Sequence, residues 1–273
     1  MKLTVIGGGG VRSLMLAKSL AQNAKEYNIT HIVFMDNNVQ KLNIFGALAR
    51  EVAIRIMPSL DFTLTTNPVE AIQGADYIIT TIRAGEDDMR IRDERIALAH
   101  NVLGQETTGA AGFSFAMRSV PALAEYCELV RKYANPNAKV FNFTNPAGVV
   151  SQTLRDMGYD FTFGICDAPT GMLRSFAHLY GIAPETVTAT CYGLNHLSFF
   201  NSIQFSGKEM LPTLINDDRI YATTDMRFFS KELTKKMGCI LNEYLYYFFY
   251  REKAVQNILD AHVTRGEVIR DVN

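Results

Sequence analysis

A thiol and a carboxylate stand side by side where a short apolar run of the sequence ends. Cys166 and Asp167 lie in "FGICDAPTGM", just before Pro169. A thiolate is a soft metal ligand, and a neighbouring carboxyl group can act as an acid or a base. The pair therefore indicates a chemical site, although a lone cysteine at a strand end is more often a small core residue.

The beginning of the chain supplies a second chemical pattern. "VIGGGGVRS" places Gly7 and Gly9 between an apolar run and a helical pattern, and the next apolar run ends at Asp36. Glycines let backbone N–H groups approach a pyrophosphate at a helix N-terminus, and a carboxylate after the second strand binds ribose hydroxyl groups. The spacing departs from a strict GxGxxG, so a glycine turn with a helix-capping aspartate is the alternative. We predict a dinucleotide site that favours NAD over NADP.

Further polar residues follow later apolar runs. Arg83 and Arg90 come after the fourth run, Glu106 lies in "GQETTG", and Asn145 lies in "NFTNPAG" after the fifth run. In an open sheet of parallel strands, the carboxyl ends of the strands line the ligand crevice. We therefore expect these side chains to converge there with the thiol and the carboxylate.

The elements that must position these residues alternate along the first two thirds of the chain. Runs typical of strands are "LTVIGG", "HIVFMD", "DFTLTT", "ADYIITTI", "AKVFNFT" and "FTFGIC", with helical patterns or loops between them. Such alternation predicts a parallel sheet with helices on both faces, and it stops at about Thr188. We therefore predict an α/β fold: a Rossmann-like, doubly wound sheet similar to that of lactate and malate dehydrogenases in residues 1–190, and an incomplete α+β domain in residues 191–273.

Composition argues against several classes of protein. The 273 residues carry a formal charge of −1, and their 27 Lys+Arg and 28 Asp+Glu are spread without long blocks. This balance indicates neither a nucleic-acid-binding nor a membrane-binding protein, and no apolar run is long enough to span a bilayer. "MKLTVIGGGG" has too short an apolar run for a signal peptide, and the four cysteines form no CxxC pair. We expect a reduced, cytoplasmic protein.

The segment "TNPAG" resembles a segment of lactate and malate dehydrogenases, which supports a nicotinamide cofactor and supplies an alternative function. Those enzymes use a catalytic histidine within a GxHG-type motif. The comparable place here reads "YGLNHLSFF", with Asn195 before His196 and no glycine after it. A 2-hydroxyacid dehydrogenase is therefore the alternative, and it would show net NADH production without a metal requirement.

Six motifs in a fixed order make a different resemblance more specific. They are "RxxDE" from Arg90, "GQETTG", "NFTNPAG", "ICDAP", "YGLNHL" and "NEYLYY", and the similarity extends from Val5 to about Val268. On these motifs the chain is identified as a member of glycoside hydrolase family 4. It most resembles the 6-phospho-glycosidases of that family, which depend on NAD and a divalent metal.

This resemblance implies hydrolysis through oxidation and elimination. NAD takes a hydride from C3 of the sugar, the resulting ketone acidifies the C2 proton, and a base removes that proton so that the glycosidic oxygen leaves. Water then adds at C1 and the ketone is reduced again. A divalent metal, usually manganese, binds the C2 and C3 oxygens and stabilises the enediolate.

The resemblance also implies a role for each chemical residue. Cys166 and His196 match the metal ligands, and Asp167 matches the acid that helps the leaving group to depart. Tyr244 matches the base at C2, and Glu106 matches a residue that helps to activate it, because a phenol with a pKa of about 10 is by itself a poor base. Each has a structural alternative: His196 as a core histidine, for example, and Tyr244 as helix packing within "YLYYFFY".

Binding residues follow from the same motifs. Arg90, Asn145 and Arg265 match substrate-binding positions, where the forked donors of arginine suit a sugar phosphate. The cofactor-binding residues are Gly7, Gly9, Asp36 and Arg83.

The resemblance implies a 6-phosphorylated glucoside or disaccharide as the substrate. "CDxP" resembles the phospho-α-glucosidase branch, whereas phospho-β-glucosidases usually carry Asn after the Cys, so Asp167 favours an α-linked substrate such as maltose 6-phosphate. A 6-phospho-β-glucosidase and an α-galactosidase of the same family are the alternatives. The chain departs from the family pattern at Ala110, where Pro is usual, and at Glu86, where a second Gly is usual. Both departures are expected to alter the loop near the nicotinamide.

The end of the sequence leads to a further expectation. Family members continue well beyond "TRGEV", and the run from Tyr244 to Tyr250 is apolar almost all round, so a helix there needs cover. We therefore expect the N-terminal NAD module to fold and the 273-residue chain alone to be weakly active or inactive. An inactive remnant that binds NAD is the corresponding alternative, and a homo-oligomer, a dimer or a tetramer, is expected of an active member.

Overall fold

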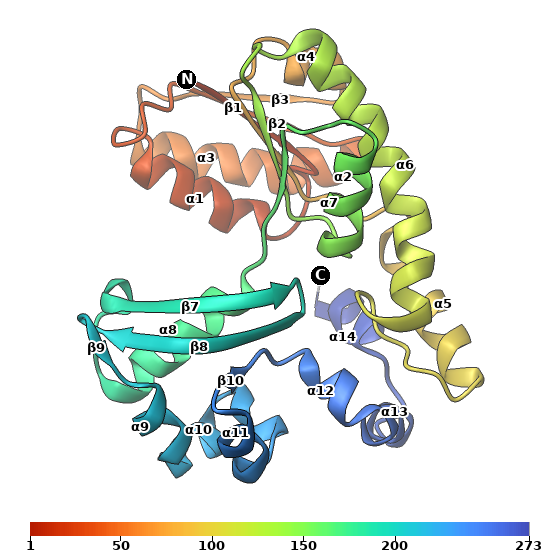
Figure 1. The fold of residues 1–273 in the computed structure, drawn as a ribbon. Coiled ribbons are helices and arrows are strands. Elements are labelled where there is room, and N and C mark those ends of the chain that lie inside the picture. Colours follow the sequence, from red (N-terminus) through yellow and green to blue (C-terminus); the bar gives the residue numbers. More distant parts are fainter. Residues whose placement is uncertain (273) are drawn as a thin grey trace. The chain divides into compact units, whose positions relative to one another are not determined.

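The computed structural model describes residues 1–272, which divide into two compact units. The first unit comprises residues 1–165 together with 263–272, and the second comprises residues 166–262 (Figure 1). The predicted division after residue 190 falls within β7 (Val187–Leu194), a strand of the second unit, and it stays a prediction. None of the helices in the described part of the chain is long and apolar enough to cross a membrane.

The first unit is built on a sheet of six parallel strands in the order β3-β2-β1-β4-β5-β6. The strands are β1 (Lys2–Ile6), β2 (His31–Met35), β3 (Asp61–Thr65), β4 (Tyr77–Thr80), β5 (Lys139–Asn142) and β6 (Thr162–Gly164). Each lies, to within one residue, inside an apolar run that predicted a strand, so the predicted doubly wound, Rossmann-like sheet is confirmed. The chain order reverses between β1 and β4, and the ligand crevice of such a sheet lies at the carboxyl ends of the strands beside this reversal.

Helices cover both faces of this sheet because successive side chains of a strand point to opposite faces. Leu3 and Val5 of β1 pack with alanines of α1 and α3, whereas Ile6 packs on the other face with residues of α4 and α6. The helices of this unit are α1 (Ser13–Asn23), α2 (Val39–Lys41), the π-helical η1 (Leu42–Gly46), α3 (Ala47–Ile56), α4 (Pro68–Ile72), α5 (Glu86–Ala99), α6 (Gly109–Tyr133), α7 (Ala147–Asp156) and α14 (Arg265–Val272).

The last helix returns to the first unit and packs on α5. Arg95 pairs with Glu267 through an Nη2–Oε2 distance of 2.6 Å, and the backbone N–H of Gly266 donates to Oε2 of the buried Glu94 at 2.8 Å. A Cβ atom at residue 266 would lie 2.9 Å from that carboxylate oxygen, so the close approach favours glycine. The chain thus leaves the first unit after residue 165 and returns to it at residue 263.

The second unit contains an antiparallel hairpin of β7 and β8 (Leu197–Phe205), to which β9 (Lys208–Glu209) and β10 (Ile240–Leu241) are added. Its helices are α8 (Ala168–Tyr180), η2 (Pro184–Thr186), α9 (Leu211–Asn216), α10 (Asp218–Thr223), η3 (Asp225–Phe228), α11 (Lys231–Met237), α12 (Leu245–Phe249) and α13 (Arg251–Asp260). A mixed α+β composition is as predicted. The hairpin itself was not expected, because most side chains of β7 are exposed and its apolar alternation is confined to the short segment 187–191.

The aromatic run after β10 does not form one buried helix. It forms the short α12 and then turns at Tyr250 into α13, whose charged residues face solvent. Leu245 is fully buried in the core of the second unit, whereas the side chain of Phe248 is 69% exposed. The apolar side chains of this run, which were expected to need burial, are thus buried at some positions and exposed at others.

Candidate functional site

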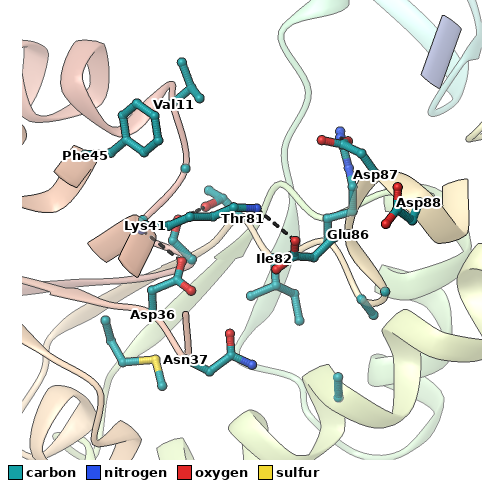
Figure 2. A pocket seen from close by; sticks show the side chains of 18 of the residues that line it. Val11, Asp36, Asn37, Lys41, Phe45, Thr81, Ile82, Glu86, Asp87 and Asp88 are labelled. Carbon is teal, nitrogen blue, oxygen red and sulfur yellow. Dashed lines mark hydrogen bonds and ion pairs between the residues drawn. The ribbon is translucent and has the colours of Figure 1, made fainter. Parts of the chain in front are cut away.

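A cleft of about 690 Å³ opens in the first unit at the carboxyl ends of β1, β2 and β4 (Figure 2). Its volume lies within the range of ligand pockets, roughly 300–1,000 Å³. The residues that line it come from the glycine turn, from the segment after β2 and from the loop after β4, and they include Gly7, Gly9, Gly10, Asp36, Lys41, Thr81, Arg83 and Glu86. All four predicted cofactor residues therefore line one cleft.

The glycine turn is packed too closely for side chains at two positions. Gly7 has a left-handed φ of +97°, and a Cβ there would lie 2.7 Å from Oγ1 of Thr81. A Cβ at Gly9 would lie 2.9 Å from Oδ2 of Asp36. Because both positions are free of side chains, a ligand can approach the backbone directly beside the N-terminus of α1, which attracts anions.

Asp36 is held in place at the end of β2 by backbone donors. Its Oδ2 accepts a hydrogen bond from the N–H of Gly9 at 2.9 Å, and its Oδ1 accepts one from the N–H of Asn38 at 2.9 Å. Each carboxylate oxygen keeps a second lone pair that can accept a ribose hydroxyl. The glycine turn, the carboxylate and the size of the cleft together fit a nicotinamide dinucleotide.

Arg83, Arg90 and Glu106 form a largely buried ion network in the same unit. Oε1 of Glu106 lies 3.2 Å from Nε of Arg83, and its Oε2 lies 3.2 Å from Nη1 of Arg90. Nε of Arg90 also donates to Glu94 at 2.9 Å, and Arg83 pairs with Asp87. The structure thus brings together three residues that the sequence predicted from separate motifs.

Two of the predicted substrate-binding residues lie outside this network. Asn145 is half-buried after β5, and Arg265 is an exposed residue at the first position of α14. Among residues 1–272, the hydrogen bonds and ion pairs join neither of them to Arg90, although Gly266 contacts Glu94. Their role stays a prediction.

In the second unit, the predicted metal ligands lie next to each other. Sγ of Cys166 is 3.5 Å from Nε2 of His196. Thiolate and imidazole groups are both types of side chain that bind transition metals. Within the described residues no group of three or more His, Cys, Asp or Glu could hold a metal ion, so an ion here would take its other ligands from water or substrate.

His196 occupies a strained turn. Asn195 and His196 connect β7 to β8, and His196 has a left-handed φ of +61°, which costs a residue other than glycine on the order of 1 kcal/mol or more. Its ring stacks on that of Tyr244, with centroids 3.6 Å apart and planes 7° apart. Burial lowers the pKa of His196 to about 4, so its imidazole is neutral and able to bind a metal at neutral pH.

Cys166 and Asp167 differ in their surroundings although they are adjacent. Burial raises the pKa of the Cys166 thiol, and hydrogen bonds from the N–H of Ala168 and the side chain of Asn195 offset part of this effect. Without a metal the thiol is therefore protonated at neutral pH, and metal binding would release its proton. Asp167 is exposed at the N-terminus of α8.

The aromatic run contains three tyrosines that could serve as a base, and the structure separates their surroundings. Tyr246 accepts a hydrogen bond from Asn257 at 2.8 Å and packs against Phe228. The ring of Tyr247 lies 6.0 Å from that of Tyr244. Of these, Tyr244 is the residue that stacks on His196, which places it beside the predicted metal ligands.

Glu243 is a further candidate site residue, which the sequence did not single out although it lies in the same "NEYLYY" motif. The pKa of Glu243 is raised to about 7, first by burial and then by a hydrogen bond and charge repulsion from Asp225 and the charge of Asp167. Its position directly before the predicted base was the available indication. Carboxyl groups with a pKa raised by burial and a like-charged neighbour are typical of functional sites.

Comparison with known proteins decides the family. The model of the family 4 glycosyl hydrolases matches residues 2–182, and the model of their C-terminal domain matches residues 191–273. The chain belongs to glycoside hydrolase family 4. It shares 30% identity over 273 residues with the 6-phospho-beta-glucosidase BglT of Thermotoga maritima, and this match covers 99% of the chain and 64% of BglT.

Solved structures of family 4 enzymes resemble the whole chain. The 6-phospho-beta glucosidase from T. maritima with NAD and glucose-6-phosphate matches with a TM-score of 0.91 and 28% identity, over 100% of this chain and 64% of that one. A 6-phospho-alpha-glucosidase from gut microorganisms in complex with NAD and Mn²⁺ matches with a TM-score of 0.88 and 27% identity, over 99% and 65%. The chain spans slightly less than two thirds of the length of these relatives.

We predict that Cys166→Ser and His196→Ala each abolish binding of Mn²⁺ and leave binding of NAD nearly unchanged. Both residues belong to the second unit, whereas the glycine turn and Asp36 belong to the first. Electron paramagnetic resonance of free Mn²⁺ and titration with NAD would measure the two affinities. The matched control is Cys191→Ser, an exposed thiol on β7. Unchanged Mn²⁺ binding in either ligand variant would contradict the metal assignment.

A second prediction concerns the dependence of stability on pH. Because the folded protein raises the pKa of Glu243 from 4.5 to about 7, it binds more protons than the unfolded chain in this window. Stability therefore falls as the pH rises from about 4.5 to about 7. Glu243→Gln should remove this loss, which is on the order of 1–2 kcal/mol after allowance for the partial exposure of the group.

Urea denaturation of metal-free protein between pH 4.5 and 8 would measure this difference. Glu232→Gln, which changes an exposed carboxyl group on α11, is the control and should follow the wild-type curve. If the free energy of unfolding changes equally with pH in the wild type and in Glu243→Gln between pH 4.5 and 8, Glu243 does not titrate near neutral pH.

Proposed function

We propose that this chain supplies the NAD-binding and metal-binding parts of a 6-phospho-glucosidase, which hydrolyses O-glycosidic bonds in 6-phosphorylated glucosides. The observation that carries the proposal is the contact of Cys166, His196 and Tyr244 in the second unit: two metal-ligand side chains 3.5 Å apart and a phenol stacked on one of them. Membership of family 4 and the relatives named 6-phospho-glucosidases support the substrate class.

NAD and a divalent metal, manganese by preference, are the proposed cofactors. When bound, NAD would supply a reversible hydride acceptor and the metal would supply positive charge for the developing oxyanion. The cleft lined by Gly7, Gly9 and Asp36 fits NAD, and solved relatives contain NAD and Mn²⁺. Cys166 and His196 would hold the metal, the neutral imidazole directly and the thiol after loss of its proton.

Tyr244 is the proposed base that removes the C2 proton. Its ring is oriented by the stack on His196, so its hydroxyl group is positioned relative to the metal ligands. Asp167 is the proposed acid for the leaving group, because it is exposed and adjacent to Cys166. Glu106 is proposed to assist activation of the base.

Arg90, Asn145 and Arg265 are proposed to bind the phosphorylated sugar. The side chain of Arg90 is only 4% exposed, and its Nη1 has no partner of hydrogen-bond geometry among residues 1–272. The 3.2 Å separation from Oε2 of Glu106 places the charges together without satisfying this donor. An unsatisfied buried donor costs about 1–3 kcal/mol, and a substrate oxygen would remove that cost.

An α-linked substrate, such as maltose 6-phosphate, is proposed because Asp167 follows Cys166. The relatives include both 6-phospho-alpha- and 6-phospho-beta-glucosidases at 28–30% identity, so overall similarity does not distinguish the two. We also propose that the protein acts as a homo-oligomer in the cytoplasm. The cytoplasmic location is supported by its four cysteines, which are all unpaired. The oligomer is supported by exposed apolar side chains of α5 and α6, such as Ile96 and Phe113, which a second copy would cover.

The function is tested with p-nitrophenyl 6-phosphoglucosides of both anomers in the presence of NAD and Mn²⁺. We expect release of p-nitrophenol from the α-anomer in preference to the β-anomer, its loss on addition of a chelator, and no net NADH. Preference for the β-anomer would assign the β-glucosidase alternative. Net NADH formation from a 2-hydroxyacid, with no effect of the chelator, would contradict the proposal as a whole.

Tyr244→Phe should abolish exchange of the C2 proton of the 6-phosphoglucoside with deuterium from the solvent, because only the hydroxyl group of the base is removed. The stack on His196 should persist, so Mn²⁺ binding and thermal stability should change little. Nuclear magnetic resonance of the sugar measures the exchange. Tyr246→Phe is the matched control, and its exchange rate should stay within about threefold of wild type. Exchange lost in the control but not in Tyr244→Phe would transfer the role to Tyr246.

A further inference from the structure

A bridge of side chains joins two segments that line the cleft of the first unit. Oε2 of Glu86 lies 3.0 Å from Nζ of Lys41, and its Oε1 accepts a hydrogen bond from Nδ2 of Asn38 at 3.3 Å. Asn38 and Lys41 belong to the segment after β2, whereas Glu86 opens α5 after β4. Figure 2 shows Lys41 extending toward Glu86, with their ion pair as a dashed line.

The backbone of Glu86 is unusual for its residue type. Its φ is +53°, directly after Gly85 with a φ of +86°. A left-handed conformation costs a residue with a Cβ roughly 1–2 kcal/mol, whereas glycine adopts it freely. Glu86 therefore adopts a backbone conformation that favours glycine. Unlike glycine, it has a side chain, which makes two polar contacts.

These contacts lie beside the carboxylate that marks the ribose end of the cleft. Oδ1 of Asp36 accepts a hydrogen bond from the backbone N–H of Asn38, whose side chain contacts Glu86. In dinucleotide-binding folds, a carboxylate at this place binds the 2′-hydroxyl of the adenosine ribose, and a nearby cation accommodates a 2′-phosphate. Lys41 is such a cation, and the carboxylate of Glu86 neutralises it.

We propose that Glu86 is a specificity-determining residue for the dinucleotide: by pairing with Lys41 it withholds the cation that a 2′-phosphate needs, and so it favours NAD over NADP. The inference rests on the proposed function of the cleft as a dinucleotide site. Glu86 is then a second carboxylate that favours NAD, in addition to Asp36. The role of Asp36 is already indicated by its place after β2. A hydrogen bond from Lys41 lowers the pKa of Glu86, so this carboxylate is ionised at neutral pH.

Calorimetric titration of the full chain with NAD and with NADP measures both affinities and tests the proposal without an activity assay. Glu86→Gln keeps the shape of the side chain and removes its charge. This variant should tighten NADP relative to NAD by roughly three- to tenfold, the size expected for one charge in a partly exposed site. The double variant Lys41→Met with Glu86→Gln should lose this gain, because no released cation remains.

Glu51→Gln is the matched control. Glu51 is an exposed carboxylate on α3 that pairs with Arg55 at 2.8 Å and does not line the cleft. Its removal should leave both affinities at the wild-type values, which excludes an effect of net charge alone.

Two results would overturn the inference while the dinucleotide site stands. In the first, the wild type binds NAD, and the ratio of the affinities for NADP and NAD is the same in Glu86→Gln as in the wild type. In the second, the gain in affinity for NADP persists in the double variant. A wild-type chain that binds neither dinucleotide would overturn the proposed function of the cleft, and this inference with it. The binding of NAD by the wild type therefore distinguishes the two failures.

Discussion

The parallel register of β1 with β2 and β4 is the constraint on which the cofactor cleft depends. Because these strands run in the same direction, their carboxyl ends meet at one edge, and the chain order reverses there between β1 and β4. The turn after β1 can then approach both neighbours, which is why Gly7 lies against Thr81 and Gly9 against Asp36. A side chain at Gly7 would collide with Thr81, and one at Gly9 would displace the carboxylate of Asp36.

In the second unit the corresponding constraint is a turn rather than a sheet edge. The two-residue connection between β7 and β8 forces His196 into a left-handed conformation, and the stack on Tyr244 and the contact with Cys166 accompany this strain. Strained residues persist where the surrounding structure over-determines them, and they gather at functional sites. The orientation of the imidazole is thus a property of the hairpin and not of the histidine alone.

The candidate site residues of the two units differ in how charge is arranged. In the cleft region of the first unit, ion pairs join Arg83 and Arg90 to Glu106. In the second unit, burial lowers the pKa of His196 and raises that of Glu243, so both groups are neutral over part of the range near pH 7. Neutral groups suit a place where a metal ion would later supply the dominant charge.

The sequence by itself determined the features that depend on local pattern. The proximity of Cys166 and His196, which the structure places 3.5 Å apart, was implied by the resemblance to glycoside hydrolase family 4. Apolar runs predicted the six parallel strands, and the glycine turn with Asp36 predicted the cleft. These succeed because strand burial and turn geometry depend on a few neighbouring residues.

Only the tertiary structure decided the contacts between residues far apart in the chain. They include the bridge from Lys41 to Glu86, the carboxyl pair of Glu243 with Asp225, and the return of α14 to α5 through Gly266. No local pattern marks such partners, because hydrogen bonds and ion pairs depend on distance in space and not on spacing in sequence. The hairpin of β7 and β8 escaped prediction for a related reason: most side chains of β7 are exposed, and the strand is defined mainly by its backbone pairing with β8.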